Sequence, residues 1–267
     1  MNHHEEVSKT TVDTLDPIIE TCLNVNGAVE PYTVFDYYDH FQSVAQTQPS
    51  FLMEFQGGSY NPYDGPAAQK VIAVNIYMVY GGTNWGNIGF PEVGTGYDCS
   101  SPIHENRLIC DKYNEVKLFG LFVRVAHEFT KVDRIGKSSK YATDEDIFTT
   151  ELRNPDTGAE YYVTRHEYSP PTNVTKLRLK VSTKAGNLTM PTSGSITLNG
   201  RQSKTLVTDF NIGSSGNKIT YATLEVLTVV DLGDRQVVVF WALDGEQGEF
   251  LLKGAKSGKA LSGKAED

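Results

Sequence analysis

Two short apolar runs in the first third of the chain each end in polar residues and glycines. Residues 50–55 have the sequence Ser-Phe-Leu-Met-Glu-Phe, and residues 71–80 are almost continuously apolar before two glycines. Apolar runs without alternation are typical of parallel strands that are covered on both faces. We therefore predict strands over Ser50–Phe55 and Val71–Tyr80, with Glu54 at the polar end of the first strand.

Two further segments of this part have helical spacing. Aromatic residues recur every three positions over Pro31–Val44, and apolar residues predict a second, longer helix over Glu105–Thr130. Strands that alternate with helices indicate an α/β arrangement. Asn114 and Glu115 fall on the polar face of the second helix, so we interpret Glu115 as a surface residue.

The pattern changes near residue 131, where short β-type runs alternate with turns. An Asn199-Gly200 pair is a hairpin signal. This spacing predicts an antiparallel β-sandwich, followed by a disordered tail over residues 254–267 that is rich in Gly, Ser, Lys and Ala. The nine predicted strands are Glu160–Arg165, Lys176–Val181, Gly186–Met190, Ser195–Leu198, Thr205–Phe210, Lys218–Ala222, Glu225–Val230, Gln236–Trp241 and Glu249–Leu252.

Length and charge limit the classes of function. The 267 residues suit one large domain or two ordinary ones, and the net charge is −9. The excess of acidic residues lies in residues 1–128. It argues against a nucleic-acid partner, because binding of nucleic acid requires a basic face on the protein. No run approaches the ~20 apolar residues of a membrane span, and residues 1–6 lack the features of a secretory signal. As written, the sequence therefore predicts neither membrane insertion nor export.

No metal or cofactor is predicted. The three cysteines, Cys22, Cys99 and Cys110, are an odd number without zinc-site spacing, and we expect idle thiols. Asn173 and Asn187 each begin a glycosylation sequon, which matters only in a secreted chain. Arg165 and His166 are interpreted as structural residues of the β-rich part.

Several segments together resemble the fungal β-galactosidases of glycoside hydrolase family 35. The resemblance covers about residues 12–252 and is most specific at Asn75–Gly89, which contains Tyr-Gly-Gly-Thr-Asn-Trp-Gly. The other segments that carry it are Phe51–Gly58, Tyr161–His166, Ala185–Pro191, Leu198–Lys204 and Thr220–Val226.

The resemblance implies a fold of class α/β plus all-β. Residues 1–130 would be the C-terminal part of a TIM (β/α)₈ catalytic barrel, and residues 131–253 the antiparallel β-sandwich that follows it. Members of the family release terminal β-linked galactose with retention, using two glutamates. Glu54 would be the nucleophile, at the end of the seventh barrel strand. The alternative is that Glu54 is a solvated or capping residue at a strand end.

The resemblance also implies sugar-contacting residues and several departures from the family. Asn84, Trp85 and Tyr97 are candidates for substrate binding, although loop architecture is the alternative role for the first two. The family's general acid, a Glu after an Asn on the fourth strand, has no counterpart here, and a sugar-contacting Tyr falls on Cys99. Fifteen residues separate Phe55 from Val71, which is short for a parallel crossover that contains a helix.

Two classes of function remain open. In the first, the chain is a retaining β-galactosidase that acts on a β-galactoside, is extracellular by family, and is inactive in isolation. A second polypeptide that supplies the other barrel strands would then complete the enzyme. In the alternative, the chain is a non-catalytic remnant whose β-sandwich binds a carbohydrate or a partner.

Overall fold

The computed structural model divides the chain into two compact units, residues 1–120 and 121–267. It describes residues 50–55, 71–76, 79–83, 96–97, 101–167, 173–200, 202–213, 216–255 and 258. Of these, residues 50–55, 71–76 and 96–97 are described by their backbone alone. The expected helix over Pro31–Val44, Cys22, Cys99 and all of the expected tail except residues 254, 255 and 258 lie outside these residues.

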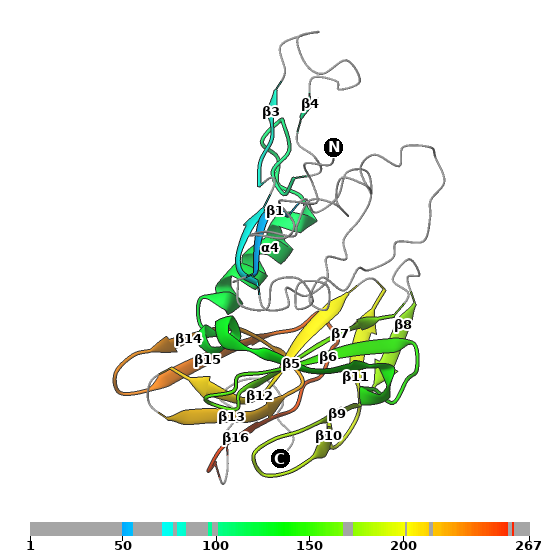
Figure 1. Ribbon diagram of the computed structural model, residues 1–267, viewed down its shortest axis with the longest axis vertical. Helices are drawn as coiled ribbons and strands as arrows, with labels where there is room; N and C mark the ends of the chain where they lie inside the picture. Colours follow the sequence, from blue (N-terminus) through cyan, green and yellow to red (C-terminus); the bar gives the residue numbers. More distant parts are fainter. Residues whose placement is uncertain are drawn as a thin grey trace, which may run out of the picture. The chain divides into compact units, whose positions relative to one another are not determined.

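The first unit contains the two expected strands. β1 (Ser50–Phe55) and β2 (Val71–Ile76) pair in parallel (Figure 1). The prediction for β1 is confirmed, whereas β2 is shorter than the expected Val71–Tyr80. Tyr80 instead forms an isolated parallel bridge with Ile103, and β3 (Gly82–Thr83) pairs with β4 (Gly96–Tyr97).

The expected helix over Glu105–Thr130 is wrong at its start. Residues 103–109 form a tight turn, in which Ile103 bridges Ile109 and His104 N donates to Leu108 O at 2.9 Å. Arg107 takes a φ of 69°, in the left-handed region that interrupts a right-handed helix. The helix α4 therefore begins only at Asp111 and ends at Val123 (Asp111–Val123).

The end of that predicted helix is wrong as well. After α4 the chain turns into a separate 3₁₀ helix, η1 (His127–Lys131), because Ala126 leaves helical geometry at ψ 55°. Phe122 and Ala126 are buried as expected, but Phe119 is 53% exposed. Asn114 and Glu115 lie on the exposed face of α4, as predicted.

The second unit is built around one antiparallel sheet of six strands, in the order β16-β13-β12-β7-β6-β5 (Figure 1). Three two-stranded ladders, β8-β11, β9-β10 and β14-β15, and the short 3₁₀ turn η2 (Ser139–Tyr141) complete the unit. The strands of the large sheet are β5 (Asp133–Ser138), β6 (Ile147–Arg153), β7 (Glu160–His166), β12 (Ser203–Ile212), β13 (Asn217–Ala222) and β16 (Phe250–Leu252). Those of the ladders are β8 (Val174–Leu177), β9 (Leu179–Val181), β10 (Leu188–Met190), β11 (Ile196–Asn199), β14 (Glu225–Asp231) and β15 (Gln236–Trp241).

Both faces of the six-stranded sheet are buried, because alternate side chains of its strands enter two different cores. Tyr161 of β7 belongs to a core with residues of β14 and of the segment around Phe122. Its neighbour Tyr162 points to the opposite face and packs with residues of β8 to β11. Both tyrosines are 0% exposed, so neighbouring residues of the same strand are buried on opposite faces of the sheet.

Strand β12 changes its alternation at Asp209, so that Val207 and Phe210 both enter the first core. Asp209 has a φ of 49°, which shifts the following side chains to the other face. Its carboxylate accepts a hydrogen bond from Lys184 N at 2.6 Å. Asp is one of the few residues other than glycine that adopts this backbone conformation readily.

The expected antiparallel β-rich unit is present, with differences in detail. Two strands, β5 and β6, were not predicted, and the expected Lys176–Val181 strand is broken at Arg178 into β8 and β9. Asn199-Gly200 does form a turn, in which Gln202 N donates to Asn199 O at 2.8 Å. The hairpin prediction is wrong, however, because the flanking strands β11 and β12 pair with different sheets.

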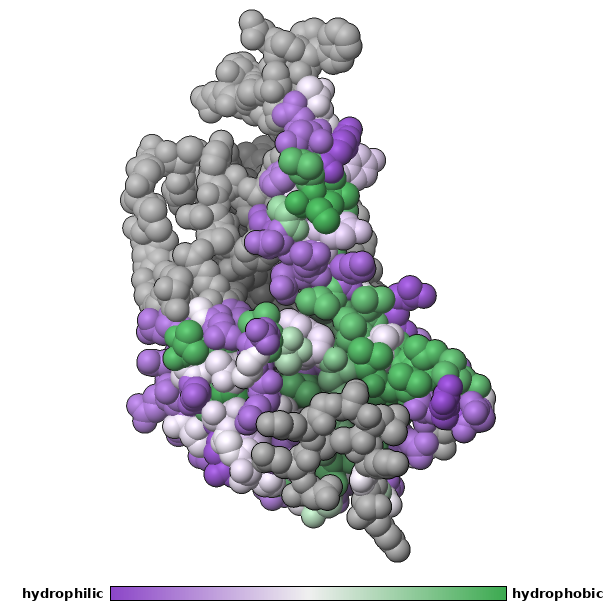
Figure 2. Space-filling model, turned by 180° about the vertical axis from the view of Figure 1, so that it is seen from behind, coloured by the Kyte–Doolittle hydropathy of each residue, from purple (hydrophilic) through white to green (hydrophobic). Residues whose placement is uncertain are grey.

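The surface of the second unit includes an apolar region over the β14–β15 hairpin, which is green in Figure 2. Val230, Leu232 and Val237 are exposed there at 42%, 51% and 37%. Among the described residues, no helix has the length and apolar character that a membrane crossing requires. The same part of the chain contains no group of three or more His, Cys, Asp or Glu side chains that could hold a metal ion.

Candidate functional site

Glu54 is the fifth of the six residues of β1, next to the end of the strand. The parallel neighbour β2 pairs with β1 from Ser50↔Val71 to Phe55↔Ile76. The two strands therefore end at the same edge of their sheet, where polar groups can face a ligand. The sequence places Glu54 at that edge, as expected from the polar end of an apolar run.

The segment that follows β2 is held by residues 101–109. Ile103 N donates to Val79 O at 3.1 Å, and Arg107 Nη1 donates to Gly81 O at 2.9 Å. The Arg107 guanidinium also lies 5.9 Å from the centroid of the Tyr80 ring. These contacts fix the backbone that leads into Gly82 and Thr83.

Of the other candidates for sugar binding, the structure describes only Tyr97, by its backbone. Asn84 and Trp85 lie outside the described residues and follow β3 directly in the sequence. Tyr97 is the second residue of β4 and pairs with Gly82, so its backbone lies beside the strand that precedes Asn84. Asn173 and Asn187 are both exposed on the second unit.

The second unit contains a buried polar cluster that the sequence did not indicate. The register of β6 and β7 places Glu151 opposite Tyr162 and Arg153 opposite Glu160. Arg153 Nε donates to Glu160 Oε1 at 2.7 Å, and its Nη2 donates to Glu151 Oε1 at 2.9 Å. The Ser182 hydroxyl donates to Glu160 Oε2 at 2.7 Å and lies 3.0 Å from Arg153 Nη2. The two buried carboxylates thus share one guanidinium.

Two tyrosines complete this cluster. Tyr162 Oη donates to Glu160 Oε2 at 2.5 Å and accepts from Ser182 N at 2.8 Å, while Tyr141 Oη donates to Glu151 Oε2 at 2.7 Å. Burial and the hydrogen bond to Glu160 raise the pKa of Tyr162, and burial and the bond to Glu151 raise the pKa of Tyr141. Both hydroxyls therefore stay protonated donors at neutral pH.

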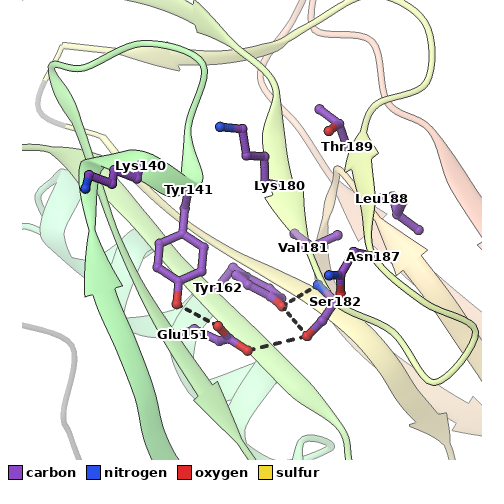
Figure 3. Close-up of a pocket in the computed structure, with 10 residues that line it drawn as sticks. All are labelled: Lys140, Tyr141, Glu151, Tyr162, Lys180, Val181, Ser182, Asn187, Leu188 and Thr189. Atoms are coloured by element: carbon purple, nitrogen blue, oxygen red, sulfur yellow. Dashed lines mark hydrogen bonds between the residues drawn. The ribbon is translucent and has the colours of Figure 1, made fainter.

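A pocket of about 520 Å³ opens beside this cluster (Figure 3). Tyr141 comes from the turn η2, and the opposite wall comes from the β9–β10 hairpin. The ten lining residues are Lys140, Tyr141, Glu151, Tyr162, Lys180, Val181, Ser182, Asn187, Leu188 and Thr189. The sequence signal for this site was the alternation of Glu151 and Arg153 on one face of β6, a strand that the sequence analysis did not predict.

Other polar residues have structural contacts, as predicted. His166 is buried and its Nε2 lies 3.0 Å from Thr175 Oγ1. Arg165 Nη1 donates to the carbonyl of His166 at 2.7 Å, and its guanidinium lies 5.3 Å from the Phe148 ring centroid. The Cys110 thiol is not in a disulfide and lies 3.7 Å from Ser101 O.

Comparison with known families now defines the class of protein. Residues 129–266 match the family "Beta-galactosidase, domain 2", and residues 2–122 match "Glycosyl hydrolases family 35". The chain therefore belongs to glycosyl hydrolase family 35, the family that its sequence resembles.

Two similar fungal proteins are both named "Probable beta-galactosidase B". The chain is 45% identical to the protein of Sclerotinia sclerotiorum over 262 residues, which is 90% of this chain and 26% of that protein. It is 46% identical to the Aspergillus terreus protein over 261 residues, 90% of this chain and 25% of that protein. The chain thus spans about a quarter of the length of these curated relatives.

Proposed function

We propose that the chain takes part in the hydrolysis of terminal β-linked galactose with retention, and that Glu54 is the nucleophile. The observation that carries this proposal is the family membership. The place of Glu54 near the end of β1, beside the parallel strand β2, is compatible with it. Family membership supports a hydrolase over a non-catalytic remnant. The substrate would be a β-galactoside, and no cofactor takes part.

The chemistry requires an ionised carboxylate and a separate acid. The Glu54 carboxylate attacks the anomeric carbon, the bond to the leaving oxygen breaks, and a second carboxylic acid gives its proton to that oxygen. Water then attacks the anomeric carbon of the glycosyl-enzyme, the bond from that carbon to Glu54 breaks and frees the carboxylate, and the second residue, now a base, takes the proton from the water. The two carboxyl groups of a retaining enzyme lie roughly 5 Å apart.

The second carboxyl group is proposed to come from polypeptide that corresponds to the remaining three quarters of the relatives. Glu115 is the one glutamate of the chain that directly follows an asparagine, as the family's acid does, but it lies on the exposed face of α4. Glu151 and Glu160 are occupied by Arg153 and by hydroxyl donors. Without an acid we expect the isolated chain not to turn over ordinary galactosides, since acid–base catalysis contributes about 10²–10⁴-fold.

The remaining assignments follow from the same proposal. Residues 1–130 would be the C-terminal part of a (β/α)₈ barrel, residues 131–253 the β-sandwich domain after it, and residues 254–267 a tail. Asn84, Trp85 and Tyr97 would contact the sugar. Asn173 and Asn187 would carry glycans if the protein is exported, and their exposure on the second unit is compatible with that modification.

The proposal is tested by complementation. The full chain is mixed with a polypeptide that covers the part of a fungal relative preceding the matched region, and release of nitrophenol from a nitrophenyl β-galactoside is measured. We expect activity in the mixture that is lost in Glu54→Gln. The matched control Glu115→Gln, in the same unit and exposed, should keep it. Activity that survives Glu54→Gln would remove Glu54 from the mechanism.

A further inference from the structure

The pocket between η2 and the β9–β10 hairpin has no role in the proposed hydrolysis. Its volume of about 520 Å³ lies within the ~300–1,000 Å³ typical of small-molecule sites. It belongs wholly to the second unit and does not involve Glu54. A ligand bound there would therefore be recognised independently of the catalytic step.

The floor of the pocket is held in place before any ligand arrives. Tyr162 is 0% exposed and Glu151 is 6% exposed. Both are fixed by hydrogen bonds, Tyr162 to Glu160 and Ser182, and Glu151 to Tyr141 and Arg153. Preorganised polar groups of this kind lower the entropic cost of binding.

The walls offer an aromatic ring and unused polar groups. Tyr141 is half-buried and packs edge-on against Tyr162 at a centroid distance of 6.2 Å. Four polar side-chain groups around Tyr141 have no hydrogen-bond partner among the described residues, and Figure 3 draws them without hydrogen bonds. These groups are the ammonium groups of Lys140 and Lys180, the amide of Asn187 and the hydroxyl of Thr189.

We propose that this pocket binds a neutral pyranose unit of a saccharide. A pyranose has an apolar C–H face that packs on an aromatic ring such as Tyr141, and hydroxyls that both donate and accept. The two ammonium groups and, in the chain without a glycan on Asn187, the Asn187 amide supply donors. Glu151 Oε2, which accepts one hydrogen bond, from Tyr141, has a further lone pair for a sugar hydroxyl.

The same arrangement excludes cleavage. Glu151 and Glu160 share the Arg153 guanidinium and accept hydroxyl donors, so neither carboxylate is free to attack or to protonate a glycoside. The pocket would therefore hold a saccharide without reacting with it.

The test is a titration of the purified full chain with β-1,4-linked galactotriose, followed by calorimetry or by NMR. We expect one site with a Kd on the order of 1 mM. Tyr141→Ala should weaken binding by about tenfold or more, whereas Tyr141→Phe, which keeps the ring, should change it by less than about threefold. Asn187→Ala should weaken binding, and the matched control Asn173→Ala, an exposed sequon residue outside the pocket, should not.

Two results would overturn the proposal. The first is no binding up to about 50 mM, or binding that is unchanged in both Tyr141→Ala and Asn187→Ala. The second is tighter binding of a uronic-acid trisaccharide than of galactotriose, which would assign the site to an anion. Thermal unfolding of each variant checks that it folds. If Tyr141→Ala does not fold, Asn187→Ala still tests the proposal, because Asn187 is exposed on the β9–β10 hairpin. Glu54→Gln should bind as the parent does, so loss of the proposed catalytic function would leave this result intact.

Discussion

Gly136 of β5 leaves room for the hydroxyl group of Tyr141. A Cβ atom on residue 136 would lie well inside any normal contact distance of Tyr141 Oη. The same Tyr141 hydroxyl donates to Glu151 at 2.7 Å. A glycine in β5 is thus part of what orients the aromatic wall of the pocket.

The first prediction follows from this contact. Gly136→Ala should displace Tyr141 from Glu151 and destabilise the protein by about 1–3 kcal/mol, because overpacking and a broken buried hydrogen bond both contribute. Urea unfolding measures the change. Gly120→Ala is the control: this helical glycine has nothing within 4 Å of an added Cβ, so alanine should stabilise by about 0.5–1 kcal/mol. Equal effects at the two positions would contradict the account.

A buried ion pair gives the second prediction. Lys204 Nζ lies 2.8 Å from Glu246 Oε2, and the two side chains are 5% and 8% exposed. Lys204→Met should cost about 3–5 kcal/mol, because it leaves a buried carboxylate without its counter-ion. In the exposed pair Lys131–Asp156, at 66% and 58% exposure, Lys131→Met should change stability by less than about 1 kcal/mol. Denaturant titrations of the two variants test the contrast.

The third prediction concerns pH. Burial acts to raise the pKa of Glu249, but hydrogen bonds from Thr192, Tyr221 and Ser193 outweigh it, and the pKa is lowered from its usual 4.5. Since the folded-state pKa is below the unfolded one, the stabilisation is fully present above about pH 4.5 and is lost as the pH falls through the folded-state value.

Glu249→Gln should therefore destabilise by about 0.5–1.5 kcal/mol at pH 7, with a difference from the parent that shrinks below pH 4.5. Thermal melts across the acid range measure this. Glu167→Gln, at an exposed side chain, is the control and should show no such trend. Burial and the bond to Glu249 raise the pKa of Tyr221 to about 12, so its hydroxyl still donates throughout this range. A difference that grows toward acid pH would refute this assignment.

The fourth prediction tests the backbone at Asp209. With a φ of 49° and a hydrogen bond from Lys184 N, this residue permits both Val207 and Phe210 to enter the same core. Asp209→Val should cost more than about 2 kcal/mol, because a β-branched residue is strained at positive φ. Asp209→Gly keeps the conformation and loses the hydrogen bond, so it should cost less. The opposite order in unfolding experiments would show that the lost hydrogen bond outweighs backbone strain at this position.

The strands that the sequence predicted well are those with a simple pattern. Ser50–Phe55 is an apolar run between polar segments, and the structure has β1 over the same six residues. The helix over Glu105–Thr130 was predicted too long because apolar spacing continues through Ala126, while the turn at Arg107 depends on pairing between Ile103 and Ile109. Helical spacing alone does not reveal such pairing.

The polar cluster was missed for a different reason. Glu151 and Arg153 are charged residues in the second half of β6, and charged residues are expected at the surface when only the local sequence is known. Their burial depends on the register of β6 against β7, which brings Tyr162 and Glu160 opposite them. The prediction that Glu54 is a catalytic residue comes from family resemblance and stays a prediction.

The central claim is that Glu54 is the residue that forms a bond to galactose. The complemented chain is treated with 2-deoxy-2-fluoro-β-galactosyl fluoride, whose leaving group needs no acid and whose fluorine slows hydrolysis of the glycosyl-enzyme. Peptide mapping by mass spectrometry then locates the label. The account predicts one fluorogalactosyl group on the peptide that contains Glu54, and none in Glu54→Gln. A label on another carboxylate, or turnover of the substrate in Glu54→Gln, would contradict it.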